Sequence, residues 1–167
     1  MIRTMALVGG VAGAIGLSQF PEFSQQYLQR LSGAVGELRI VVVGFDAAAL
    51  ASGKSRADAL ASMPDTGFEG ELKQTLGASI ARFERLDADL ASLRAASPLE
   101  RLAQPWNMAD GDLVAKTWED FKPAVPVTAD GAISAAIGFA GGWVLVGGLL
   151  GFLTRPFRTR RRVRKAA

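Results

Sequence analysis

The sequence has no cysteine and no histidine, and it contains one tyrosine among its 167 residues. Without cysteine, disulfide bonds are excluded and the redox compartment cannot be read from them. Without either residue, zinc, haem and iron–sulfur sites lose their usual ligands, and histidine general-base and Ser-His-Asp chemistry are excluded. We therefore predict no catalytic residue, no cofactor and no metal site, and a protein that is not an enzyme.

Three local patterns superficially suggest a reactive or nucleotide-binding site. The stretch "GGVAGAIG" has glycine spacing but no preceding strand, and "SGKS" at residues 52–55 lacks the first glycine of a phosphate-binding loop. Glu84, Asp87 and Asp89 lie close in sequence to Arg82 and Arg85. On a helix such a cluster indicates a solvated face with ion pairs three and four residues apart, so we reject all three as sites.

Charge is distributed unevenly along the chain. All sixteen acidic residues fall within residues 22–130, where eleven bases accompany them, so this stretch carries −5 although the whole chain carries +3. Seven of the nineteen bases lie in residues 155–165. The pI of about 9.7 therefore describes a tail rather than a basic domain, and it argues against nucleic acid as a partner.

The segment directly before this tail is the longest uncharged one. Residues 131–154 contain no charge, and as a helix they would extend about 36 Å, enough to cross a hydrocarbon core of about 30 Å. Thr128 is suited to cap the start of this helix. A buried core helix is the alternative, but the segment has no polar face and the chain is too short to wrap it. We predict a transmembrane helix.

A second uncharged segment covers residues 4–21 and would extend about 27 Å, the short end of a span. One interpretation is a retained membrane helix. Another is a cleaved signal peptide, because Arg3 forms a minimal basic start and Gly16 and Ser18 have cleavage-site spacing. A third is an amphipathic or buried helix. The bulky "FPEF" just after the cleavage position favours retention.

Basic residues close to a span collect on the cytoplasmic side of a membrane. This rule places the C-terminus in the cytoplasm, and two spans place the N-terminus there too, with the acidic middle outside. The tail would also bind anionic lipid head groups. The residues assigned to orientation and anionic-lipid binding are Arg155, Arg158, Arg160, Arg161, Arg162, Arg164 and Lys165.

Glycines recur four residues apart in both uncharged segments, a spacing that lets helix backbones approach closely in lipid. The predicted helix-packing residues are Gly9, Gly13, Gly138, Gly142, Gly147 and Gly151. The two spans of one chain could pack on each other, or the glycines could serve a homo-oligomer or another membrane protein. Neither segment contains a charge, which argues against a transporter.

The region between the spans has a helical, coiled-coil-like periodicity. We expect long helices over residues 22–51 and 69–96, and short ones near residues 55–63, 99–105 and 112–121. The simplest packing is an antiparallel hairpin of the long helices. Apolar residues follow 3-4 spacing first at Leu28, Leu31, Val35, Leu38, Val42, Phe45 and Ala49, and then at Leu72, Leu76, Ile80, Phe83, Leu86, Leu90 and Leu93.

Aromatic residues lie where this region should meet the outer membrane surface, a level that aromatic side chains favour. The predicted membrane-interface residues are Phe20, Phe23, Trp118 and Phe121. A ligand site for an amphiphile at this level is one alternative.

Two stretches carry a family resemblance, "QFPEF" at residues 19–23 and "WEDFKPAVP" at residues 118–126. With the apolar ends, they make the chain resemble a proteobacterial family of small inner-membrane proteins known only as a domain of unknown function. The resemblance implies a bacterial inner-membrane location and no activity or site residue.

The sequence thus predicts an all-α membrane protein with two transmembrane helices flanking a periplasmic antiparallel helical hairpin. Its parts are a first span or uncleaved signal anchor (1–21), a periplasmic helical region (22–127), a second span (128–154) and a basic cytoplasmic tail (155–167). We expect a non-enzymatic scaffold, adaptor or accessory subunit of an envelope complex. The alternative is a lipid- or amphiphile-binding module. Expected partners are membrane lipids, and another membrane protein or a second copy of the chain.

Overall fold

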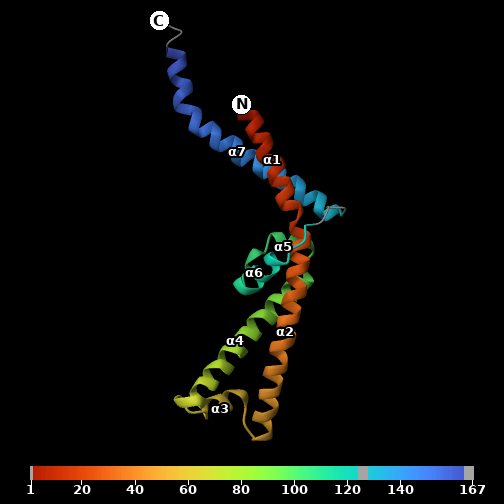
Figure 1. Cartoon of the computed structure of the whole chain (residues 1–167), viewed down its shortest axis with the longest axis vertical. Helices are drawn as coiled ribbons and strands as arrows, with labels where there is room; N and C mark the ends of the chain where they lie inside the picture. The colour runs from red at the N-terminus through yellow and green to blue at the C-terminus, as the bar shows by residue number, and fades with distance from the viewer. Residues whose placement is uncertain (1, 124–127, 164–167) are drawn as a thin grey trace. The chain divides into compact units, whose positions relative to one another are not determined.

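The computed structural model describes residues 2–123 and 128–163, with side chains described up to Thr154 in the last helix. Throughout these residues the regular structure is helical, which confirms the all-α prediction (Figure 1). The elements are α1 (Ile2–Ser18), α2 (Phe20–Ala51), α3 (Arg56–Ala61), α4 (Gly67–Ala95), α5 (Pro98–Leu102), the 3₁₀ helix η1 (Pro105–Met108), α6 (Gly111–Glu119) and α7 (Ala129–Val163).

The chain divides into two compact units. The terminal unit comprises Met1–Ser24 and Phe121–Ala167, and the central unit comprises Gln25–Asp120. The two terminal segments therefore belong to one unit although the whole of Gln25–Asp120 separates them in sequence.

In the terminal unit, α1 and α7 pack against each other in antiparallel order. Gly13 lies against Gly138, and Gly9 lies against Gly142, so residue numbers fall along α7 as they rise along α1. The Gly131 amide donates to Thr128 Oγ1 at 3.1 Å, which confirms Thr128 as the cap of this helix.

Both apolar helices differ from their expected limits. Helix α1 ends at Ser18, and α2 begins at Phe20, so that only Gln19 lies between the two helices. Pro21 is tolerated there because the amides of a first helical turn need no partner within the helix. At the other end, α7 does not stop where the uncharged stretch stops but continues to Val163. The apolar character of the last span therefore ends nine residues before the helix does.

In the central unit, α2 is one helix through "IVVVG", as its periodicity predicts. It ends in a Schellman motif, in which Gly53 adopts φ +69°. The Gly53 amide donates to Leu50 O and the Lys54 amide to Ala49 O, both at 2.9 Å. Glycine has no Cβ to oppose this left-handed conformation, so it closes the helix at low cost.

The short helices begin at polar caps. Ser55 accepts from the Asp58 amide at the start of α3. Ser97 and Glu100 form a complete capping box at the start of α5, with Pro98 in the first turn. Both starts are confirmed, because a cap depends on residues within one turn and can be read directly from sequence.

The two apolar seams of the central unit supply its core. On α2, Leu31, Val35, Val42 and Ala49 are buried. Tyr27, which lies outside the expected seam, is completely buried as well. On α4 the buried residues are Ile80, Leu86, Leu90 and Leu93.

Polar contacts tie α2 to α4 along their length. Arg94 Nη2 donates to Ser32 Oγ at 2.8 Å, and Arg39 Nη2 donates to Asp87 Oδ1 at 2.8 Å. The order of these contacts is antiparallel, since the later residue of α2 meets the earlier residue of α4. Farther along, Arg56 of α3 bonds both to Asp46 and to Glu84.

Candidate functional site

The contact between α1 and α7 is closest where the backbone of one helix meets the backbone of the other. A Cβ placed on Gly13 would lie 2.2 Å from Gly138 O, and one placed on Gly138 would lie 2.1 Å from Gly13 O. A Cβ on Gly142 would lie 2.1 Å from Gly9 O. Real Cβ atoms do not approach oxygen this closely, so any larger residue at these positions would force the helices apart. This close approach is the geometry that small-xxx-small spacing permits.

The remaining glycines of the predicted packing set contribute less. A Cβ on Gly147 would lie 3.3 Å from Ala6 Cβ, whereas one on Gly151 would meet nothing within 4 Å. Gly10, which the spacing argument did not include, lies against the Phe139 ring, 2.9 Å from a placed Cβ. The structure therefore brings Gly9, Gly13, Gly138 and Gly142 together and leaves Gly151 outside the contact.

One helix of the described residues is long and apolar enough to cross a membrane. It is the part of α7 from Ala129 to Thr154, which has a mean hydropathy of 1.9 and only 6% of its apolar window buried. A core helix of a water-soluble protein would be mostly buried, so the low buried share favours membrane association. Helix α1 has 17 residues and is about 25 Å long, less than a hydrocarbon core of about 30 Å. A second span therefore stays a prediction.

The outer faces of both helices are apolar. On α1 the exposed large residues include Val8 (65%) and Ile15 (64%), and on α7 they include Val144 (70%) and Phe152 (70%). Water would oppose such a continuous apolar surface, whereas lipid would not.

The aromatic residues predicted for the membrane interface fall in both units of the chain. Phe23 and Phe121 meet edge to face in the terminal unit, with ring centroids 5.7 Å apart and planes at 71°. Phe20 is half-buried in the same unit. Trp118 belongs to α6 of the central unit and is 71% exposed.

The basic tail follows α7. The helix continues to Val163, which covers Arg155, Arg158 and the Arg160–Arg162 run, although the positions of their side chains are not described. Arg164 and Lys165 lie outside the described residues. The predicted roles of this tail in orientation and lipid binding stay predictions.

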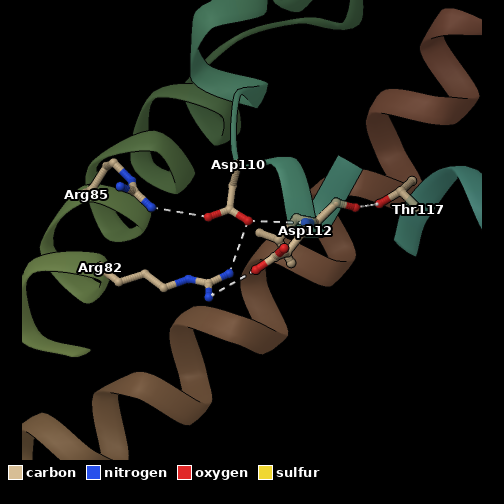
Figure 2. Close-up of polar contacts among 6 residues, drawn as sticks. Arg82, Arg85, Asp110, Asp112 and Thr117 are labelled. Carbon is tan, nitrogen blue, oxygen red and sulfur yellow. Dashed lines mark hydrogen bonds and ion pairs between the residues drawn. The ribbon is translucent and has the colours of Figure 1, made fainter. Parts of the chain in front are cut away.

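A polar cluster that sequence reasoning missed is centred on Asp110 (Figure 2). The Asp110 carboxylate is 6% exposed and accepts from Arg82 at 3.1 Å and from Arg85 at 3.2 Å. It also accepts from the Leu113 amide at 3.2 Å, and so caps α6. Two guanidinium groups and a helix N-terminus compensate the cost of burying this charge.

The capping role of Asp110 was overlooked because the last short helix was expected to begin at Asp112. Asp112 is the more obvious first-turn acid, but its carboxylate is 72% exposed and lies 3.5 Å from Arg82. Asp110 lies three residues before Leu113, which is the spacing of an N-cap. This spacing was the feature of the sequence that could have identified it as the cap. Thr117 completes the helix by donating to Leu113 O at 2.6 Å.

The expectation that the α4 charges pair along their own helix is wrong for the pairs described. Arg82 and Arg85 bond to Asp110, Asp87 bonds to Arg39 of α2, and Glu84 bonds to Arg56 of α3. The physical reason is that neighbouring elements bring these opposite charges within reach across the central unit. These charges therefore fasten α4 to its surroundings, while Arg85 and Glu84 stay more than 60% exposed to solvent.

The only tyrosine of the chain lies beside this cluster. Burial raises the pKa of the Tyr27 hydroxyl to about 12, with the backbone of Asp110 and the charges of Asp110, Asp89 and Arg85 as smaller influences. Burial also raises the pKa of Asp89. In the described residues, no group of three acidic side chains could hold a metal ion.

Arg101 is a second buried charge that the sequence did not single out. It is 7% exposed, and its Nε donates to Leu93 O at 2.8 Å, near the C-terminal end of α4. Its Nη1 lies 3.4 Å from Gln25 Oε1. A cation at a helix C-terminus is favoured by the helix dipole and by the unpaired carbonyls there. Arg101 therefore holds α5 against the end of α4.

Comparison with known proteins places the chain in a family without adding an activity. No curated protein and no solved structure matches it. A family model does match, and it covers residues 1–159, which is nearly the whole chain. This confirms the resemblance to a domain of unknown function: the chain belongs to the family described as Protein of unknown function (DUF2937).

Proposed function

We propose that this protein is a two-span membrane protein that acts without catalysis, as an adaptor or accessory subunit that presents its central helical unit to a partner. The observation that carries the proposal is the backbone contact between α1 and α7. A helix of 17 residues is short for a span on its own, but α1 packs along α7 through Gly9 and Gly13 and shows an apolar outer face.

A lipid environment would explain why α1 and α7 pack through glycines. In a membrane, helices gain little from burying apolar side chains against each other, because the lipid is equally apolar. Close backbone approach then becomes the main source of association. Two helices that are apolar outside and glycine-lined inside match this requirement, and α7 has the length to cross.

The charge pattern supports one topology. Arg3 and the basic tail would lie on the cytoplasmic side of a bacterial inner membrane, and the acidic residues 22–130 on the periplasmic side. The central unit would then be an antiparallel hairpin of α2 and α4, closed by α3, α5 and α6. Its ion pairs and caps suit an aqueous compartment.

Single cysteines test this topology, since the chain has none of its own. In intact cells, a thiol reagent that cannot cross the inner membrane should label Ser52→Cys and should label Ala167→Cys only after the membrane is opened. Labelling of both positions in intact cells, or extraction of the chain by carbonate without detergent, would contradict the proposal.

A lipid- or amphiphile-binding role is the second candidate. It is favoured by the edge-to-face contact of Phe23 and Phe121, aromatic side chains of the kind found at a membrane interface. Protein purified in mild detergent should then retain one defined lipid and lose it in the Phe121→Ala variant. An adaptor should instead co-purify with one protein in a fixed ratio.

A further inference from the structure

Helix α2 carries a second 3-4 seam on the side opposite its buried one. Its six members are all exposed and span two and a half heptads: Gly33, Gly36, Ile40, Val43, Ala47 and Leu50. Ile40 is 70%, Val43 58% and Leu50 78% exposed. A Cβ added at Gly33 or Gly36 would meet nothing within 4 Å. Such a seam is the pattern by which one helix packs on another.

The size gradient of the seam makes it complementary to itself. The small residues Gly33 and Gly36 lie at one end and Leu50 lies at the other. When two copies run antiparallel, Leu50 falls on Gly33 of the partner, Ala47 falls on Gly36, and Ile40 falls on Val43. Leucine then meets glycine at each end of the seam, and Ile40 and Val43 meet in its middle. In a parallel pair, glycine would face glycine and leucine would face leucine.

Charge favours the same arrangement. Arg39 and Asp46 flank the seam on one side, seven residues apart. In the antiparallel pair each Arg39 comes beside Asp46 of the other copy, twice by symmetry, whereas in a parallel pair they do not meet. Arg39 is held in place by Asp87 at 2.8 Å and by the Phe83 ring, 5.7 Å from its guanidinium carbon. Asp46 accepts from Arg56 Nε and Nη2 at 2.7 and 2.5 Å. Because a guanidinium has five donors and a carboxylate about four acceptor sites, each group can still form a further bond across the dimer.

We propose that the protein forms a homodimer in which the outer seams of two α2 helices pack antiparallel. Because α2 is already folded within the central unit, pairing does not require a helix to form first. The inference adds a partner to the proposed adaptor, namely a second copy of the chain, and does not depend on the adaptor role.

Cysteine linkage of the full chain tests both the contact and its direction. Under mild oxidation, in detergent and in lipid nanodiscs, the Gly33→Cys/Leu50→Cys double variant should form covalent dimers. The two sites lie about 25 Å apart along one helix, so they cannot link within a chain. Gly33→Cys/Ala78→Cys, with its second cysteine at an exposed position of α4, is the matched control and should stay monomeric.

The single-cysteine variants establish whether the two α2 helices run antiparallel or parallel. Leu50→Cys alone should not link in the antiparallel dimer, and linkage of this variant would establish a parallel pair and overturn the proposal. Ile40→Glu should weaken dimerisation about tenfold or more, because two buried isoleucines are lost. Phe68→Glu, at an even more exposed apolar residue of α4 (81%), should leave dimerisation unchanged.

If no variant links and Ile40→Glu changes nothing, the dimer is disproved. The proposed membrane anchoring would survive that result, because it is read from thiol labelling and extraction. Circular dichroism of each variant establishes that its helices are intact, so that a loss of linkage reports on the contact and not on folding.

Discussion

The two units of this protein hold their helices together in opposite ways. In the terminal unit, the helices approach most closely where side chains are missing, and Gly13 and Gly138 bring backbone against backbone. In the central unit, helices meet through large side chains such as Leu31 and Leu86, both fully buried, and through charges such as Arg39 and Asp87. The proposed location of the terminal unit in lipid accounts for the difference, because water rewards burial of apolar side chains, whereas lipid rewards close backbone packing.

The strongest test of this comparison is to add a side chain to the glycine contact. Gly13→Ile should separate α1 from α7, at or above the upper end of the roughly 1–3 kcal/mol typical of overpacking. The obstacle is a backbone oxygen 2.2 Å from the new Cβ, and backbone cannot rotate away. The measurement is disulfide formation between Ala6→Cys and Gly147→Cys, whose Cβ atoms would lie 3.3 Å apart.

Gly16→Ile is the matched control, because a Cβ at Gly16 meets nothing within 4 Å. It should leave the Ala6→Cys/Gly147→Cys disulfide intact. Equal loss of the disulfide in both variants would show that helix propensity, and not the backbone contact, decides the packing.

In the central unit, the corresponding break is Asp110→Ala. It removes the acceptor of two arginines and the cap of α6, and we expect a loss of about 3 kcal/mol. Urea unfolding in mild detergent, followed by circular dichroism, measures it. Asp112→Ala removes an exposed carboxylate that also meets Arg82, and it should cost no more than about 1 kcal/mol. Similar losses for the two variants would contradict the role assigned to Asp110.

Tyr27 provides a pH-dependent test of the buried core. Its pKa is raised from 10.0 to about 12, so the folded state favours the protonated hydroxyl. The protonated hydroxyl contributes its full stabilisation to the folded state below pH 10. Between pH 10 and about 12 the free energy of unfolding falls by roughly 2–3 kcal/mol as the hydroxyl ionises. Because the chain has one tyrosine, tyrosinate absorbance reports it directly, with a midpoint near 12 when folded.

Tyr27→Phe separates this effect from the titration of lysines, which occurs in the same range. The variant should lose less stability between pH 10 and 12 than the parent does. A tyrosinate midpoint near 10 in the folded protein would mean that the hydroxyl is reached by water.

The smallest expected effect concerns a helix cap. Ser97→Ala removes the capping box of α5 and should cost about 1 kcal/mol of unfolding free energy. Ser79→Ala is the control, since Ser79 only donates to the carbonyl of Thr75 on the exposed side of α4. A cost for Ser79→Ala equal to that for Ser97→Ala would argue that the cap contributes nothing specific.

Features that depend on neighbouring residues were predictable from the chain alone. The caps at Ser55, Ser97 and Thr128 and the closure at Gly53 each involve residues within a turn or two. The helical period through "IVVVG" also outweighed its β-propensity. In each case the physical determinant is local, so the sequence displays it directly.

The candidate site was only partly predictable. Glycine spacing indicated which faces of the apolar segments could pack, but not that Gly151 would lie outside the contact. Asp110 was hidden because its arginine partners lie 25 and 28 residues away. The outer seam of α2 was overlooked because it follows the same 3-4 spacing as the inner one.

The sequence by itself determined that the chain is helical, where its capped helices start, and that one helix suits a membrane. These properties follow from the order of apolar, capping and charged residues along one helix. Only the tertiary structure decided which glycines touch, which carboxylate two arginines share, and which of two seams on α2 is buried. Such choices depend on distances between segments remote in the chain, and a helical period alone does not distinguish an inner face from an outer one.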